Sequence, residues 1–373
     1  MVKKPRSCTY RILVSVLVLF GLCLLLSIVS LFGNRNLPVE GRSELLHEVD
    51  KARLLESLHL KATLGDRVWP GWGSADIPVI VWNRSYEFLV DYNEEAPAGW
   101  SIVSGDDLNG QEYFRRSADN PQNFAVRVGD AWAASIANKN TTDVFLITAF
   151  QENLPTPITQ VFPYRFLIQP SETQMGGLLH ETFHVFQYQN TAVRMEAAES
   201  MHGLEDEYEL AFESFNGEWR QEAGLLAEAL NAQTHSEKAD LVRRFLDLRD
   251  SRRADYNLEK NLVEYERWLE WEEGTAKYIE IAILRQASET AEYQPVPGME
   301  DDPDFKQYLT IGQRWSQELF QLRYQTSPGE SRFYATGMAQ AFLLDDLMPD
   351  WKEQYWIEET FLEDFLRSAV MDS

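Results

Sequence analysis

The stretch that decides how this chain is interpreted is residues 178–188, LLHETFHVFQY, in which residues 180–184 match the pattern H-E-x-x-H. Residues four apart on a helix share a face, so His180 and His184 can hold one cation between two imidazoles. Neutral imidazole nitrogen is a good zinc ligand, and bound zinc lowers the pKa of a water molecule towards about 7. Glu181 can then take the proton as a general base, so the motif predicts a metal-dependent hydrolytic centre.

The residues around the motif favour a helix. Ser171 begins an S-x-x-Q pattern, which is typical of a capping box at a helix N-terminus. Leu179, Phe183 and Phe186 form an apolar stripe at helical spacing, and the two histidines form a second stripe with Gln187. One face can therefore be buried while the other faces a site. The alternative is a coincidental histidine pair on a structural helix.

A catalytic zinc site usually has three protein ligands and keeps one position open. Candidates for the third ligand are His202, His235 and many acidic residues. The best segment is residues 268–280, WLEWEEGTAKYIE.

An H-E-x-x-H motif followed by a helical E-G-x-A-x-Y segment resembles the gluzincin metallopeptidases, whose third zinc ligand is a glutamate. The matching residues are 273–278, EGTAKY, and the resemblance implies that Glu273 is the third ligand of one Zn²⁺ per chain. It also implies a zincin-like fold and hydrolysis of peptide bonds. Residues 190–262 separate the two segments, and we expect them to form a helical excursion that returns. No G-x-M-E-N-type exopeptidase signal precedes the motif, so a pocket for an N-terminal amine is not assigned, and the endo- or exopeptidase preference stays open.

The residue sizes around Glu273 agree with this assignment. Gly274 and Ala276 are small, so their helix can pack closely against the motif helix and bring the carboxylate to the roughly 2 Å of a zinc–oxygen bond. The alternative is an acidic helix face that is only solvated, made of Glu270, Glu272, Glu273 and Glu280.

In gluzincins a tyrosine or histidine after the third ligand commonly stabilises the oxyanion. No histidine follows His235, so we expect a tyrosine: Tyr334, in residues 332–347, with Tyr278 as the second choice. A metal-bound histidine normally donates its other N–H to a carboxylate or carbonyl. The candidates for this second role are Glu199, Glu266, Glu270 and Asp345.

The N-terminal part predicts a membrane anchor. Residues 12–32 hold no charge and no proline, and about 20 such residues can cross a bilayer as a helix. The basic residues Lys3, Lys4, Arg6 and Arg11 precede them, which predicts a cytoplasmic tail (1–11) and an extracytoplasmic remainder in a single-pass protein of the cell membrane. A cleaved signal peptide is the alternative, although its apolar region is normally shorter, about 7–15 residues.

The rest of the chain predicts an α+β fold. Residues 33–66 read as a stalk or first helix, 67–170 as a β-rich lobe with a mixed or antiparallel sheet, and 171–373 as a mainly helical lobe that carries the zinc site. The expected strands are 78–82, 86–90, 123–128, 143–150 and 159–169. Because zincins bind an extended peptide by strand addition, the last of these is the candidate substrate-binding edge.

The net charge and the positions of the cysteines exclude further classes of function. The net charge of −25 argues against binding of nucleic acid or anionic lipid surfaces. Both cysteines, Cys8 and Cys23, lie in or before the anchor, so the outer part is not a disulfide-stapled scaffold. We therefore expect a membrane-anchored zinc metallopeptidase acting on a peptide or protein. The alternatives are a zinc hydrolase of another amide or ester, and a non-catalytic binding domain with a vestigial site.

Overall fold

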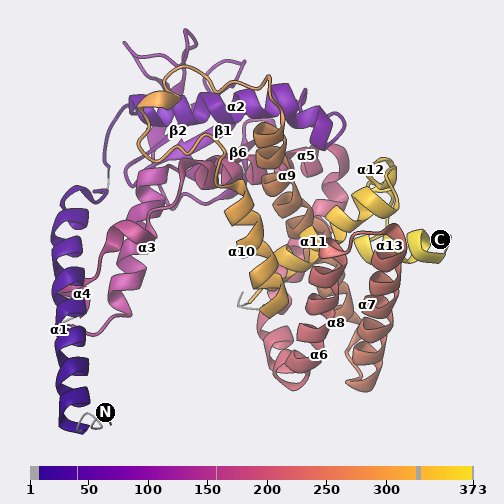
Figure 1. Ribbon diagram of the computed structural model, residues 1–373. Coiled ribbons are helices and arrows are strands. Elements are labelled where there is room, and N and C mark those ends of the chain that lie inside the picture. The colour runs from indigo at the N-terminus through magenta and orange to yellow at the C-terminus, as the bar shows by residue number, and fades with distance from the viewer. Residues whose placement is uncertain (1–7, 40, 157, 325–328, 372–373) are drawn as a thin grey trace.

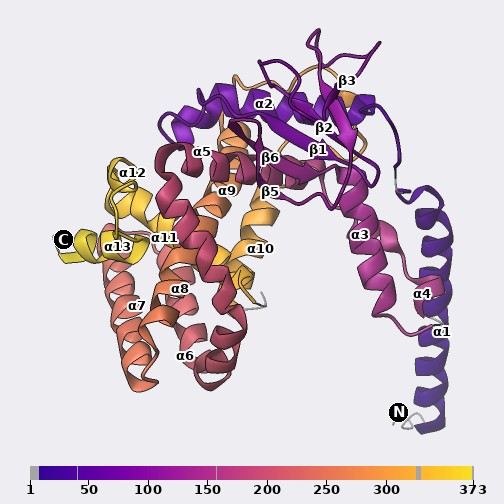
Figure 2. The ribbon, with the colours of Figure 1, turned by 180° about the vertical axis from the view of Figure 1, so that it is seen from behind.

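The computed structural model describes residues 8–371 apart from 40, 157 and 325–328, so residues 1–7 of the expected cytoplasmic tail lie outside the described residues. The chain forms an arch (Figure 1). A sheet and helix α2 lie across the top, α1 and α3 descend on one side, and a group of helices descends on the other. The view from behind shows β5 and β6 alongside α5 (Figure 2).

The elements have the following bounds. The helices are α1 (Cys8–Gly33), α2 (Glu48–Val68), α3 (Lys139–Glu152), α4 (Ile158–Val161), α5 (Ser171–Met201), α6 (Glu205–Asn231), α7 (His235–Asp255), α8 (Lys260–Leu269), α9 (Thr275–Glu289), α10 (Ile311–Tyr324), α11 (Ser331–Leu347), α12 (Trp351–Gln354) and α13 (Leu362–Met371). The short helical turns are η1 (Asn34–Asn36), η2 (Tyr164–Leu167), η3 (His202–Leu204), η4 (Glu270–Gly274) and η5 (Met299–Asp301). The strands are β1 (Val79–Trp82), β2 (Tyr86–Val90), β3 (Ser101–Ile102), β4 (Phe114–Ser117), β5 (Phe124–Val128) and β6 (Ala131–Ala137).

The sheet is mixed and has six strands in the order β3-β4-β2-β1-β6-β5. Strands β1 and β6 are parallel, and the other neighbours are antiparallel. This confirms the α+β class. It also confirms the predicted strands that became β1, β2 and β5, whose Val, Ile and Phe residues fit a pleated, half-buried surface.

Two predicted strands are wrong. The apolar run 143–150 lies in helix α3, because Asn138 caps that helix by accepting from the backbone N–H of Thr141 at 2.9 Å. Lys139 and Asp143 then form an ion pair one turn apart. Residues 159–169 form α4 and η2 instead of the expected edge strand, and Pro163, which lacks an N–H, lies between the two.

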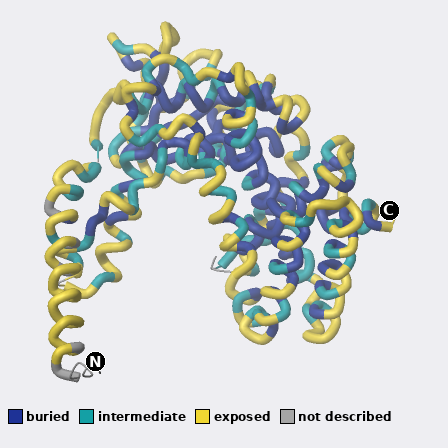
Figure 3. Tube along the Cα trace, viewed as in Figure 1, coloured by how far each residue is buried: buried dark blue, intermediate teal, exposed yellow. Residues whose placement is uncertain are grey.

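The sheet buries residues on both faces. Val79, Val81 and Phe88 point into the main core, shared with α2, α5 and α9. Ile80 and Leu89, which alternate with them, join a smaller cluster on the other face. Figure 3 shows the buried residues concentrated across the top of the arch and between the helices of the larger side. The sheet therefore supports α5 from one side.

Helix α2 belongs to this core, with Leu54, Leu60 and Leu64 at most 2% exposed. It also holds the start of α5: Arg53 donates two hydrogen bonds of 2.7 Å to Asp302, which accepts a third from the hydroxyl of Ser171 at 2.6 Å. Ser171 therefore does not cap its own helix, and the predicted capping box is wrong.

Helix α1 and the η1 turn that follows it contain a stretch, Ile12–Asn36, that is long and apolar enough to cross a membrane. Near the C-terminal end of this stretch Ser30 and Asn34 donate to the carbonyl of Phe162, at 3.1 and 2.8 Å. These bonds tie the helix to the segment between α4 and η2.

Candidate metal centre

The motif histidines lie on the buried half of α5. Leu179 and Phe183 are at most 1% exposed and pack in the main core, as their spacing predicts. His180 and His184 lie on the adjacent face, 7% and 0% exposed. The helical geometry breaks at Thr191 (φ −156°, ψ 72°), so residues 192–201 run in a different direction from the motif.

Glu273 comes from η4, a π-helical turn between α8 and α9. Such turns widen a helix by one residue and are frequent at functional sites. The turn packs directly against α11: a Cβ atom on Gly274 would lie 2.9 Å from the carbonyl carbon of Gly337. The small residues therefore permit a close approach, although the three atoms nearest to the Gly274 position all belong to α11 rather than to the motif helix.

The two histidines and Glu273 converge on one point. His180 Nε2 lies 3.0 Å from His184 Nε2 and 3.0 Å from Glu273 Oε2, and His184 Nε2 lies 3.3 Å from the same carboxylate oxygen. All three side chains are buried. The structure thus brings together the three residues expected to bind zinc, from segments far apart in the sequence.

The spacing of these donors fits a small divalent cation. Zinc ligands lie about 2.0–2.2 Å from the ion, so two ligands of a tetrahedral site are about 3.3 Å apart. The observed 3.0–3.3 Å is close to this value. Two imidazoles and one carboxylate are also a donor set that zinc uses in hydrolases.

Gln187 orients His184. Its Oε1 atom lies 2.9 Å from His184 Nδ1. The Gln187 amide nitrogen faces the backbone carbonyls of Trp271 and Glu272, which only accept, so Oε1 must be the atom that faces the imidazole. The neutral form of His184 therefore carries its proton on Nδ1 and presents the Nε2 lone pair to the centre.

The acids proposed for this orienting role lie elsewhere. Glu266 and Glu270 bind arginines of α7, and Asp345 accepts from Tyr278. Glu199 interacts with Tyr188. The prediction that one of them holds an imidazole is therefore not met among the described residues. Gln187 could have been found, because it follows His184 at helical spacing on the same face.

Glu181 has the properties of a general base. The side chain is partly exposed, but its Oε2 atom is buried and has no hydrogen-bond partner among the described residues. Burial raises the pKa of Glu181 to about 7, against the opposing influence of His180 and His184. A carboxyl group with a pKa near neutrality can both accept and return a proton at physiological pH.

The predicted tyrosine is at the centre. The ring of Tyr334 stacks on His180 with the centroids 5.7 Å apart and the planes 9° from parallel. Burial and the neighbouring Glu273 carboxylate, which the hydroxyl contacts, raise the pKa of Tyr334 far above its ordinary value, so it stays a hydrogen-bond donor. Tyr278 instead donates to Asp345 at 2.6 Å and receives a bond from Lys352.

The centre favours a positive charge. Burial alone would lower the pKa of His184, but the Glu273 carboxylate raises it to about 10. The same attraction from His184 and His180 overcomes burial and lowers the pKa of Glu273 well below its ordinary value. A cation at this point would replace the proton, because ligation needs the neutral imidazole and the ionised carboxylate.

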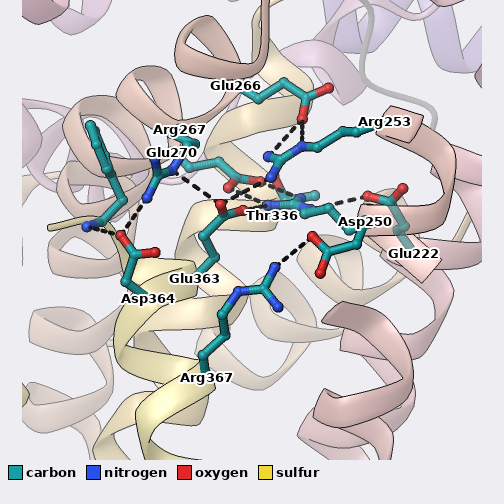
Figure 4. A network of polar contacts seen from close by, with 12 residues as sticks. Glu222, Asp250, Arg253, Glu266, Arg267, Glu270, Thr336, Glu363, Asp364 and Arg367 are labelled. Atoms are coloured by element: carbon teal, nitrogen blue, oxygen red, sulfur yellow. Dashed lines mark hydrogen bonds and ion pairs between the residues drawn. The ribbon is translucent and has the colours of Figure 1, made fainter. Parts of the chain in front are cut away.

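A buried network of ion pairs contacts the η4 turn through Glu270, the first residue of the turn (Figure 4). Glu270 accepts two hydrogen bonds from Arg249, at 2.7 and 2.8 Å, and one from Thr336 at 2.6 Å. Arg249 is completely buried and also pairs with Glu222 and Glu363. Arg249 lies on α7, within the stretch 190–262 that separates the two motif segments. This stretch therefore packs back against the turn that carries Glu273 and stabilises it.

Strand β5 lies beside the centre at the edge of the sheet. Phe124, its first residue, packs against His184 with the ring centroids 4.9 Å apart. Only one side of β5 is paired with another described strand.

Comparison of the chain with protein-family models, with curated proteins and with solved structures found no match. The geometry of the centre therefore carries the functional argument.

Proposed function

We propose that this chain is a membrane-anchored, zinc-dependent metallopeptidase. The observation that carries the proposal is the convergence of His180, His184 and Glu273 within 3.0–3.3 Å of one another. When bound there, Zn²⁺ would supply a Lewis acid and lower the pKa of a water molecule towards about 7.

The remaining residues have complementary roles. Glu181 holds the proton of the attacking water and passes it to the leaving amine, which its pKa of about 7 allows. The hydroxyl of Tyr334 donates to the oxyanion that develops on the substrate carbonyl. Gln187 keeps the Nε2 lone pair of His184 directed at the centre.

The position of β5 favours a peptide substrate. An extended peptide can add to the unpaired side of an edge strand through main-chain hydrogen bonds. Strand β5 takes this role in place of the segment 159–169, and the contact between Phe124 and His184 puts the start of the strand next to the centre.

The full-length protein in detergent tests the proposal with two variants. His180→Ala removes a ligand and is expected to lose the zinc ion of this centre and the hydrolysis of a peptide library. Glu181→Gln should keep the zinc and lose at least about 100-fold in kcat, as expected for a general base. Normal zinc content in His180→Ala would refute the site, and normal turnover in Glu181→Gln would refute the mechanism.

The proposed topology puts residues 1–11 in the cytoplasm and the centre outside, with α1 as the anchor in the cell membrane. The basic residues before α1 support it. A membrane-impermeant maleimide applied to intact cells should label Gln221→Cys on α6 and leave the wild-type cysteines unlabelled. Labelling only after lysis would reverse the topology.

A further inference from the structure

A second group of donors lies next to the first centre. One donor atom each from His202, Glu272 and Glu273 lie within 4.8 Å of one another. Glu272 and Glu273 are neighbours on η4, and His202 opens η3, just after α5. The break in α5 at Thr191 redirects the chain between the motif and His202.

Glu272 is the strongest indication that this group holds a ligand. Its side chain is 0% exposed, neither carboxylate oxygen has a partner within hydrogen-bond geometry among the described residues, and the ion-pair partner of Oε2 is His202 of the same group. The Oε1 atom of Glu199, a carboxyl group that the charge of His202 influences, is also buried without a partner among the described residues. Buried charges in proteins are normally paired or coordinate a metal, because removing an unpaired carboxylate from water is very costly.

His202 is oriented as a metal ligand. Its Nδ1 atom lies 2.8 Å from Glu330 Oε2, and Glu330 is held in turn by the hydroxyl of Tyr265 at 2.8 Å. A carboxylate on one ring nitrogen of a histidine fixes the other nitrogen as a ligand. That other nitrogen, Nε2, faces Glu272.

The distance between His202 and Glu272 also points to a shared cation. His202 Nε2 lies 3.4 Å from Glu272 Oε2. Charge-assisted hydrogen bonds are shorter, about 2.7–2.9 Å. Two ligands of one tetrahedral zinc ion are about 3.3 Å apart, which matches the observed distance.

We propose that His202 and Glu272 form a second divalent-cation site, with Glu273 as a carboxylate that the two sites share. A carboxylate has two oxygens and can therefore serve two cations at once. The mixed nitrogen and oxygen donors suit a transition-metal ion such as Zn²⁺. The proposal concerns binding and does not depend on the hydrolase reaction.

The test measures how many zinc ions the full-length protein binds in detergent. The protein is first stripped of metal and then titrated with Zn²⁺ in a calorimeter. Elemental analysis checks the bound zinc. The wild type should bind two ions per chain. His202→Ala and the nearly isosteric Glu272→Gln should each bind one, and His180→Ala should keep the second-site ion. His235→Ala, at the exposed start of α7, is the matched histidine control and should bind two.

The outcomes separate the two sites. A wild type that binds one ion, with no further loss in His202→Ala, overturns the second site and leaves the first. Two ions in both His202→Ala and Glu272→Gln overturn the assignment to these residues. A wild type that binds none overturns both sites. Circular dichroism of each variant distinguishes loss of a ligand from loss of the fold. If His202→Ala does not fold, Glu272→Gln alone tests the second site.

Discussion

Gly274 and Gly337 touch backbone to backbone: a Cβ atom added to Gly337 would lie 2.7 Å from the Cα atom of Gly274 and would also meet the carbonyl oxygen of Glu270. The turn that bears Glu273 thus rests directly on α11. We expect Gly337→Ala to lower the free energy of unfolding by about 3 kcal/mol, because neither backbone can yield as a side chain would. Urea unfolding measures this.

Gly224→Ala is the control for that experiment. Gly224 lies inside α6, and a Cβ atom there would meet nothing within 4 Å. Alanine is the better helix former, so this variant should be neutral or gain up to about 1 kcal/mol. Equal stability of the two variants would contradict the close packing of η4 on α11.

The hydrogen bond from His184 to Gln187 predicts an effect on metal affinity. Gln187→Leu removes the acceptor at Nδ1, so the imidazole loses its fixed tautomer and orientation. We expect the zinc Kd to rise about 10–100-fold, as for other partners of metal-bound histidines. Chelator competition measures the Kd. Gln189→Leu, on the exposed side of the same helix, should leave it unchanged, and an unchanged Kd in Gln187→Leu would remove Gln187 from the centre.

Tyr334→Phe tests the oxyanion donor. The ring can still stack on His180, so zinc content should stay normal, but the hydroxyl is lost. Removal of one oxyanion donor typically costs about 100-fold or more in kcat. Tyr324→Phe, an exposed tyrosine on α10, is the control. A normal kcat for Tyr334→Phe would show that the tyrosine only packs.

The buried network predicts acid sensitivity. Burial would raise the pKa of Glu363, but Arg253 and Arg249 outweigh it and lower that pKa from 4.5 to about 2. The contribution of the ionised Glu363 to the free energy of unfolding is on the order of 3 kcal/mol. It is fully present above about pH 4.5 and is lost as the pH falls through about 2. The slope of unfolding free energy against pH in this window should be smaller in Glu363→Gln.

Glu353→Gln, at an exposed position of α12, is the control and should keep the wild-type slope. If Glu363→Gln keeps that slope as well, another group is responsible for the acid dependence of the stability.

The motif helix and the identity of the clustered side chains could be predicted because they depend on local spacing. His180 and His184 are four residues apart, which is enough to put both on one helix face. Tyr334 also lies where a tyrosine was expected, against His180. The supports of the centre could not be predicted, because Arg249 reaches Glu270 from another helix and no periodicity encodes that pairing.

The β-rich region shows where local reasoning fails. Residues 143–150 have the apolar, β-branched composition of a strand, yet the cap at Asn138 starts a helix there. Strand β6, AWAASIA, was missed because alanine favours helices, and it is a strand because its neighbours β1 and β5 pair with both of its sides. A helix cap outside the apolar run decided the first segment, and pairing with neighbouring strands decided the second.

If α1 is a membrane anchor, as proposed, the burial of α2 limits where a proteolytic cut could release the rest of the chain intact. A cut on the carboxyl side of Leu64 would leave Leu54, Leu60 and Leu64 on the N-terminal fragment and strip them from the core. It would also release Asp302 and Ser171 from Arg53. Among the described residues, the connector between η1 and α2, residues 37–39 and 41–47, is where a cut would leave α2 whole on the released portion.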